Sequence, residues 1–248
     1  AGLADCSTFL YMHVIGREEM RAAALEAARR AVELGPELAQ THVSLGLALS
    51  LTQDHAAAEA EFERALELDP RLFEAHYFYA RNCFMQGDVD KAVRLYEEAS
   101  ALRPEDYQSP LLVGQLYEDL KQPARAEAAR RRGLKVAEAR LALHPDDVRA
   151  LYMGANALVG LGESERGLEW AQRAFELDPG DAMLLYNLAC IYAMAGRGEE
   201  ALDFLERAVR AGMNRPAWVR NDSNLDSIRG HPRFAAVLRR LEGQQPPG

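Results

Sequence analysis

Cysteine is scarce in this chain. Its three cysteines, Cys6, Cys83 and Cys190, lie far apart and form no paired motif. Disulfide frameworks and zinc sites need cysteines in pairs or clusters, so the sequence predicts neither. We therefore expect a reducing compartment, with the cytoplasm as the simplest choice.

Long apolar runs are also missing. No stretch reaches the roughly 18 residues that a membrane-spanning helix needs, and the start of the chain has no basic stretch followed by an apolar signal core. We expect no membrane insertion. Because the sequence begins with Ala1 rather than Met, within what reads as a helix, we expect a fragment or a processed form of a longer protein.

Positive charge is in deficit. The chain carries 29 Lys and Arg residues against 38 Asp and Glu residues, a formal net charge of -9. Such a surface repels phosphate backbones, so we expect no nucleic-acid partner. The apolar share of 48% is typical of a chain that folds around a core.

Catalytic motifs are lacking as well. The sequence has no phosphate-binding glycine loop, no nucleophile elbow and no kinase motif. No two of its six histidines have the i, i+4 spacing of helical metal ligands. His42 and His76 lie 34 residues apart and occupy one repeat position. We interpret them as partly buried packing residues; the alternative is a metal-assisted hydrolase built on their stacking. The prediction is no enzyme, no cofactor and no metal.

What the sequence does have is an internal repeat. Related prolines recur at steps of 34, 34, 41 and 34 residues, namely Pro36, Pro70, Pro104, Pro145 and Pro179. The seven extra residues are close to two helical turns, so they lengthen a helix without turning its apolar face away from the core. We predict five repeats, at residues 39–72, 73–106, 107–147, 148–181 and 182–213.

Within the repeats, small residues alternate with larger apolar ones at helical spacing. The small residues allow two antiparallel helices to approach closely, and examples are Gly46, Ala58, Ala80, Ala92 and Ala201. Asp54 and Asp88 stand where a helix N-cap is expected. We also expect each repeat proline to open a helix, where its missing amide hydrogen is harmless.

The first of these repeats reads Leu45-Gly46, Ala58, Phe62, Ala65 and Pro70 at fixed offsets. It resembles the signature of the tetratricopeptide repeat (TPR) superfamily. The resemblance implies an all-α fold, a right-handed superhelical solenoid of about six antiparallel helix pairs with a C-terminal capping helix. Residues 1–38 read as a divergent N-terminal repeat, with a helix over Ala1–Val14, a break at Gly16 and a helix over Glu18–Leu34.

Residues 214–248 are predicted to form the C-terminal cap and a frayed tail at Gln244–Gly248. Short turns are expected at Pro216–Arg220 and Leu225–Arg229, before a final helix over His231–Glu242. One face of that helix is apolar, with Phe234, Val237, Leu238 and Leu241. Its outer face is expected to be polar, with Arg233, Arg239, Arg240 and Glu242, since an array must end on a polar surface.

Two segments carry a narrower resemblance. Ala1–Cys6 and Asp222–Arg229, the latter continued by His231–Phe234, are similar to the TPR regions that follow the catalytic domains of bacterial serine/threonine kinases and adenylate cyclases. That family usually has a proline where Ser223 stands. The resemblance implies the regulatory or docking part of a larger signalling protein.

In TPR arrays the first helix of each pair lines the concave surface. By this family rule we expect an exposed groove that binds a protein or peptide. Its candidate residues are Val43, Ser44, Leu47, Tyr77, Phe78, Arg81, Leu111, Leu112, Gln115, Arg149, Tyr152, Met153, Asn156, Tyr186, Asn187 and Cys190.

Three alternatives stay open. Asn156 and Asn187 occupy the asparagine positions of a carboxylate clamp known from chaperone-binding TPRs, but Tyr152 replaces its lysine. The basic run Arg125–Arg140 could instead dock an acidic partner, or be a solvated helix face. Finally, the chain could be an assembly scaffold that self-associates weakly through its convex faces.

Overall fold

The computed structural model describes residues 18–243, and their side chains from Arg21 onward. These residues form thirteen α-helices and one 3-10 helix, and they contain no strand. The all-α prediction is therefore confirmed. The predicted helix Ala1–Val14, the break at Gly16, the motif Ala1–Cys6 and the tail Gln244–Gly248 lie outside the described residues.

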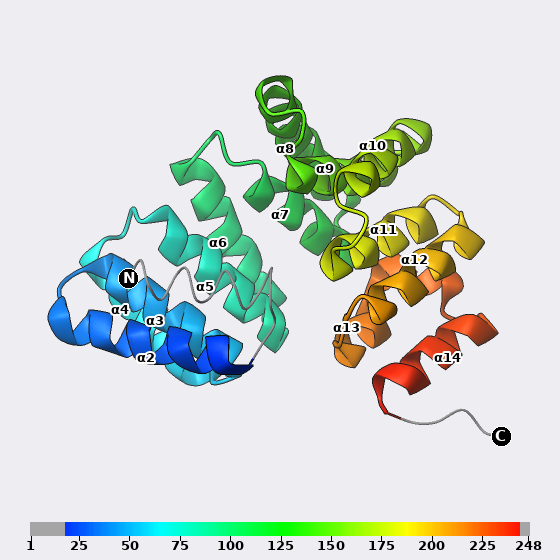
Figure 1. Cartoon of the computed structure of the whole chain (residues 1–248). Coiled ribbons are helices and arrows are strands. Elements are labelled where there is room, and N and C mark those ends of the chain that lie inside the picture. The colour runs from blue at the N-terminus through cyan, green and yellow to red at the C-terminus, as the bar shows by residue number, and fades with distance from the viewer. Residues whose placement is uncertain (1–17, 244–248) are drawn as a thin grey trace. The chain divides into compact units, whose positions relative to one another are not determined.

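The helices divide between two compact units, one ending at Ser109 and one beginning at Pro110 (Figure 1). The N-terminal unit holds α2 (Glu18–Leu34), α3 (Ala39–Leu51), α4 (His55–Leu68), α5 (Phe73–Gln86) and α6 (Val89–Leu102). The boundary falls within α7 (Gln108–Asp119). The C-terminal unit continues with α8 (Pro123–Leu143), α9 (Val148–Gly160), α10 (Ser164–Leu177), α11 (Ala182–Met194), α12 (Gly198–Arg210), α13 (Pro216–Asn221), the 3-10 helix η1 (Ser223–Ile228) and α14 (Pro232–Leu241).

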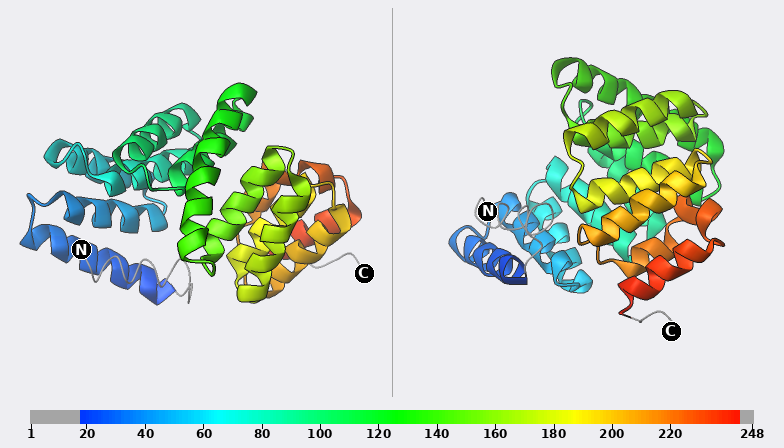
Figure 2. Two further views of the ribbon diagram at one scale, coloured as in Figure 1. Left: turned by 90° about the horizontal axis from the view of Figure 1, so that it is seen from above. Right: turned by 45° about the vertical axis from the view of Figure 1, so that its right-hand side comes forward.

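Consecutive helices pack as pairs, α3 on α4 and α5 on α6 in one unit, and α9 on α10 and α11 on α12 in the other (Figure 2). Small residues make the close approach possible. A Cβ atom added to Gly46 would lie 2.9 Å from the ring of Phe62, and one added to Gly167 would lie 2.9 Å from the carbonyl oxygen of Ala155. The other predicted contact residues, Ala58, Ala80, Ala92 and Ala201, are fully buried.

The two predicted N-caps are present. The carboxylate of Asp54 accepts a 3.3 Å hydrogen bond from the backbone N–H of Ala57, and that of Asp88 accepts one of 3.1 Å from Lys91. The expected role of the repeat prolines is wrong. Pro36 and Pro70 lie in turns ahead of α3 and α5, and their carbonyl groups accept hydrogen bonds from histidines further along the chain.

The seven extra residues of the repeat at 107–147 lie in α8, which has 21 residues where α9 has 13 and α10 has 14. Ala126, Gly133 and Ala137 are buried along it, so the seam keeps its helical spacing over the whole length. None of the described helices is both long and apolar enough to cross a membrane.

After α12, the chain folds back on its own unit. The 3-10 helix η1 packs on α11 and α12, and α14 packs on α12. Phe234 and Val237 are buried, as expected for the apolar face of the last helix. Arg233 was expected on the outer face, and this is wrong. Its guanidinium lies within 2.9 Å of Glu199, 2.6 Å of Asp203 and 2.8 Å of Glu206, all on α12, because three carboxylates attract it inward.

Candidate peptide-binding surfaces

The most accessible apolar surface on a first helix is on α5. Phe84 is 45% exposed, and Phe78, Arg81 and Met85 are partly exposed. Successive residues of an α-helix are rotated by roughly 100°, which places these four side chains within one arc of the helix. We call them the α5 stripe. It offers aromatic and aliphatic area around one guanidinium group.

A cluster of rings supports the stripe from behind. The ring of Tyr77 lies 5.6 Å from Phe73, 5.3 Å from Phe78 and 5.5 Å from Tyr96, measured between centroids. Its hydroxyl group donates a 3.2 Å hydrogen bond to Gln108. Tyr77 is consequently only 7% exposed, so its predicted exposure is wrong. It fixes the orientation of Phe78 rather than offering a surface of its own.

The candidate residues on α3 are also covered. Val43, Ser44 and Leu47 are buried, and the Ser44 hydroxyl donates to the carbonyl oxygen of Gln40. Their predicted exposure is wrong because α3 is enclosed on several sides, by α2, α4 and α5. Within the N-terminal unit, the accessible part of the predicted groove is therefore reduced to the α5 stripe.

The paired histidines have one repeated geometry. His42 places Nδ1 2.6 Å from Glu61 and Nε2 2.9 Å from the carbonyl oxygen of Pro36. His76 places Nδ1 2.9 Å from a carboxylate oxygen of Glu98 and Nε2 2.9 Å from the carbonyl oxygen of Pro70. Both rings are buried. Each histidine thus ties the turn before its repeat to the second helix of that repeat.

A second polar cluster joins α4, α5 and α6. The hydroxyl oxygen of Tyr79 lies 2.6 Å from Glu59 and 2.8 Å from Glu63, so that its one hydrogen is shared between two carboxylates. Lys91 forms an ion pair with Glu59 and lies 4.5 Å from the centre of the Tyr79 ring. The hydrogen bonds from Lys91 and then from Tyr79 lower the pKa of Glu59. Nearby, burial raises the pKa of the Cys83 thiol to about 11, so this thiol is a packing group rather than a nucleophile.

In the C-terminal unit, several candidates are partly exposed and several are buried. Leu112, Gln115, Arg149, Tyr152, Asn156 and Asn187 are partly exposed. Leu111 and Met153 are buried, contrary to expectation. Leu111 packs against Gly133, where an added Cβ atom would lie 2.7 Å from the leucine side chain. The absence of a side chain at Gly133 draws α7 onto α8 and covers Leu111.

The two asparagines of the possible carboxylate clamp bind within the protein. Asn156 donates its amide to the sulfur of Met194 at 3.4 Å, and Asn187 donates to the carbonyl oxygen of Met183 at 2.7 Å. Each side chain therefore has one hydrogen-bond partner within the chain, as the structural alternative predicts.

Tyr186 and Cys190 are covered by the chain itself. Oδ2 of Asp222 accepts a 2.6 Å hydrogen bond from the Tyr186 hydroxyl and lies 3.5 Å from the Cys190 sulfur. Burial raises the pKa values of Tyr186 and Cys190 well above their ordinary ranges. Their predicted exposure is wrong because α13 and η1 occupy the surface of α11. Ser223 reaches further, donating a 2.8 Å hydrogen bond to Asp119 on α7.

The motif that resembles the kinase and cyclase regions builds this covering segment. Asp222 caps η1 by accepting from the backbone N–H of Asn224 at 3.0 Å. Leu225 and Ile228 are buried, and Arg229 donates to the carbonyl oxygen of Asp222 at 2.9 Å. The motif therefore has a structural role in closing the last repeat.

The basic run on α8 contains one residue that is not on the surface. Arg130 is only 5% exposed; it pairs with Glu118 at 2.7 Å and crosses over Gly114 and Gly160. Arg131 pairs with Glu127 one turn away, and Arg140 with Asp147. As a docking patch the run is weaker than its sequence indicates, because one of its arginines, Arg130, is used inside the fold.

Sequence reasoning missed Phe84 and Met85 as surface residues. Their signal was available, since both follow Phe78 and Arg81 at helical spacing on the first helix of a repeat. It also missed the contact between Asp119 and Ser223, because a bond across more than a hundred residues has no local signature.

Two sequence profiles match this chain, and both describe tetratricopeptide repeats. One matches residues 19–73 and 152–216, and the other residues 49–109. No curated protein matches the chain.

Three solved structures illustrate the same fold. A tetratricopeptide repeat protein from Parabacteroides merdae shares 17% identity over 99% of this chain and 93% of its own, with a TM-score of 0.59. TTC0263, a TPR protein of Thermus thermophilus, shares 23% identity over 81% of this chain and 98% of its own, with a TM-score of 0.57. A chain of the APC/C hetero-tetramer Cut9–Hcn1 shares 16% identity over 96% of this chain and 52% of its own, with a TM-score of 0.60.

Proposed function

Because this chain belongs to the tetratricopeptide repeat superfamily, whose members are interaction modules, we propose that it binds a peptide segment of a partner protein on the α5 stripe. The observation that carries the proposal is the exposure of Phe84, 45%, beside Phe78 and Met85 on a first helix of the array. Adjoining exposed apolar side chains, rather than single ones, mark recognition surfaces, and aromatic residues and Met are enriched in interface cores.

The chemistry of the stripe indicates the kind of segment it fits. Phe78 and Phe84 supply ring area at a low cost in conformational entropy, and Tyr77 holds the first of them in place. Arg81 lies between them along the helix and supplies hydrogen-bond donors for a carboxylate or a backbone carbonyl. A short amphipathic segment with two apolar residues around an acidic one would match this pattern.

The test is a variant that removes the surface without removing the core. Phe84→Ala combined with Arg81→Ala should leave the melting temperature nearly unchanged, since neither side chain is buried. The affinity for a partner captured from a lysate of the source cell should fall by on the order of 2 kcal/mol or more.

The matched control is Leu143→Ala with Arg131→Ala, which removes an apolar and a basic side chain that are also exposed, on α8. This control should bind like the parent. Equal affinity for the parent and the stripe variant, with loss in the α8 variant, would move the binding surface to the basic helix.

The wider setting we propose is the docking part of a larger signalling protein, supported by the resemblance of Asp222–Arg229 and His231–Phe234 to TPR regions of kinases and cyclases. The full-length gene product decides this. A catalytic domain of either kind on the same chain is the expected result, and a gene product without one contradicts it.

A further inference from the structure

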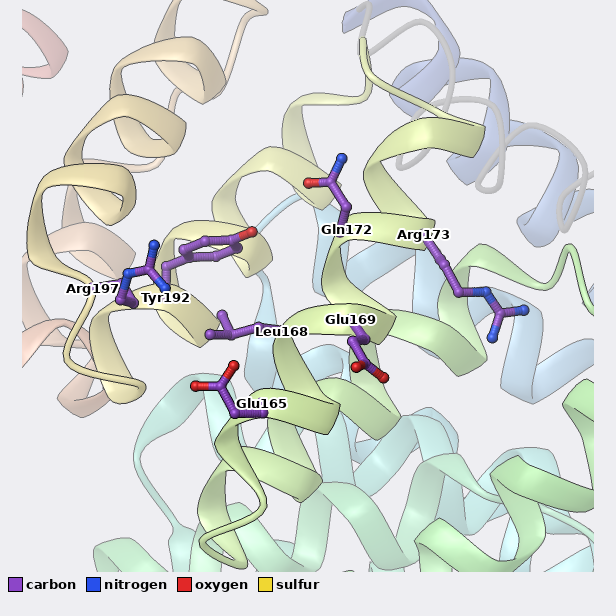
Figure 3. Close-up of a pocket in the computed structure, with 7 residues that line it drawn as sticks. All are labelled: Glu165, Leu168, Glu169, Gln172, Arg173, Tyr192 and Arg197. Atoms are coloured by element: carbon purple, nitrogen blue, oxygen red, sulfur yellow. The ribbon is translucent and has the colours of Figure 1, made fainter.

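A shallow hollow of about 560 Å³ lies along α10, on the second helix of its repeat (Figure 3). Glu165, Leu168 and Glu169 of α10 line it, together with Tyr192 of α11 and Arg197 at the start of α12. We call it the α10 hollow. It belongs to a second helix, whereas the α5 stripe lies on a first helix.

The floor of the hollow is apolar and firmly held. Leu168 and Tyr192 are half-buried, and Figure 3 shows Leu168 beside the Tyr192 ring. The Tyr192 ring lies 4.9 Å from Phe204, which lies 5.4 Å from Phe175, between ring centroids. Because the tyrosine is packed against a second ring, the floor has a fixed shape.

The charged side chains at the rim differ in whether they already bind a neighbouring group. Arg197 donates its Nε hydrogen to Glu200 at 2.9 Å, and Arg173, also at the rim, donates to the carbonyl oxygen of Pro145 at 3.3 Å. Among the described residues, Glu165 and Glu169 form no ion pair or hydrogen bond within 4 Å, although Arg197 lies near enough to Glu165 for an electrostatic interaction. They lie one turn apart on α10, so they share a face. The hollow therefore presents two carboxylates beside an apolar floor, of which Glu165 also faces the cation of Arg197.

We propose that the α10 hollow binds a lysine or arginine side chain from a basic segment of a partner protein. The methylene stem lies on Leu168 and the Tyr192 ring, and the cationic head lies between Glu165 and Glu169. Long basic side chains bury their stems in this way while keeping the charge near solvent, and an aromatic face adds attraction for the cation.

Two properties favour a basic occupant over others. The formal charge of -9 steers cationic segments toward the chain. An acidic segment would meet the two carboxylates at the rim, and a purely apolar one would leave them beside a surface stripped of water. The inference rests on the chain being an interaction module, but it assigns a second surface with the opposite charge preference to Arg81.

The experiment titrates decalysine into the whole chain and follows the Leu168 methyl and Tyr192 ring signals by NMR. We expect both signals to shift. Glu165→Gln with Glu169→Gln should weaken decalysine binding at least five-fold. The control Asp146→Asn with Asp178→Asn removes the same charge from exposed positions of the same unit and should change affinity less than two-fold. Leu168→Ala, checked for an unchanged melting profile, should also weaken binding.

Two results would overturn the proposal. Equal weakening in the hollow variant and in its control would mean general attraction to a negative protein. Concentration-dependent dimers of the chain alone, lost on Glu165→Gln with Glu169→Gln, would make a second copy the occupant. The two proposals can fail independently. The variant Phe84→Ala with Arg81→Ala tests the α5 stripe, and it should bind decalysine like the parent if the α10 hollow is the site.

Discussion

The hydroxyl group of Tyr186 donates a 2.6 Å hydrogen bond to Asp222, joining the first helix of the last repeat to the segment that follows the array. The same carboxylate caps η1 through its other oxygen. One side chain thus satisfies a buried hydroxyl and fixes the start of the helix that covers it.

Replacing Asp222 by Ala should lower the free energy of unfolding by about 2 kcal/mol, because a buried donor loses its acceptor and η1 loses its cap. Urea unfolding followed by circular dichroism measures this. Asp226→Ala is the control, since Asp226 forms an exposed pair with Arg229, and it should cost no more than about 1 kcal/mol. Equal effects would show that the bond to Tyr186 is unimportant.

Gly167→Ala should destabilise the chain by about 1–3 kcal/mol, although alanine is the better helix former. The added methyl group would meet the backbone oxygen of Ala155, which has little room to move. The control is Gly180→Ala, where an added Cβ atom has no neighbour within 4 Å. Thermal unfolding should show a drop for the first variant only, and an unchanged melting temperature for Gly167→Ala would refute the packing argument.

Arg130→Ala and Arg131→Ala should differ clearly in how much they lower the free energy of unfolding. Arg130 is buried and pairs with Glu118, so its loss leaves a space beside Gly114 and Gly160 and should cost about 2 kcal/mol or more. Arg131 is exposed and, among the described residues, pairs with Glu127 on its own helix, a type of contact worth about 0.5 kcal/mol. Denaturant titration of both variants measures the difference. Similar losses would contradict the structural role of Arg130.

Glu59→Gln should destabilise the chain at neutral pH by on the order of 1 kcal/mol, because the hydrogen bonds from Lys91 and Tyr79 favour the ionised carboxylate. The pKa of Glu59 is lower in the folded chain than in the unfolded chain. Its contribution to stability is therefore present above the unfolded pKa of about 4.3 and is lost as pH falls through the folded pKa.

The measurement for Glu59 is unfolding of both proteins between pH 7 and pH 3. Parent and variant should converge toward the acidic end. Glu105→Gln, an exposed residue, serves as the control and should track the parent throughout. A difference for Glu59→Gln that stays constant or grows on acidification would contradict the assignment.

The sequence predicted where the helices lie better than it predicted which of their side chains are exposed. The recurring prolines and small residues located the helix pairs, and Asp54 and Asp88 located two helix starts, because these signals act over a few residues. Whether a side chain on the open side of a first helix is exposed depends on what packs there. Tyr186 is covered by a segment more than thirty residues away, and no local pattern reports such a contact.

Arg130 illustrates a signal that was present but outweighed. It is one of three consecutive arginines, which favours a solvated basic face. Its spacing from Ala126, Gly133 and Ala137, however, places it in the buried seam of α8. The run of arginines led to the prediction of a basic surface, and the helical spacing that places Arg130 in the seam was not used. The α5 stripe was predicted only in part. Phe78 and Arg81 were assigned to the surface, whereas Phe84 was not.

The contacts of Arg233 indicate which helix should unfold first when the salt concentration is raised. Three carboxylates of α12 converge on this one guanidinium, while only Phe234 and Val237 of α14 are fully covered. Ionic attraction weakens when dissolved salt increases, and burial of apolar groups does not. Concentrated salt should therefore loosen α14 from α12, so that the C-terminal end of this unit opens first.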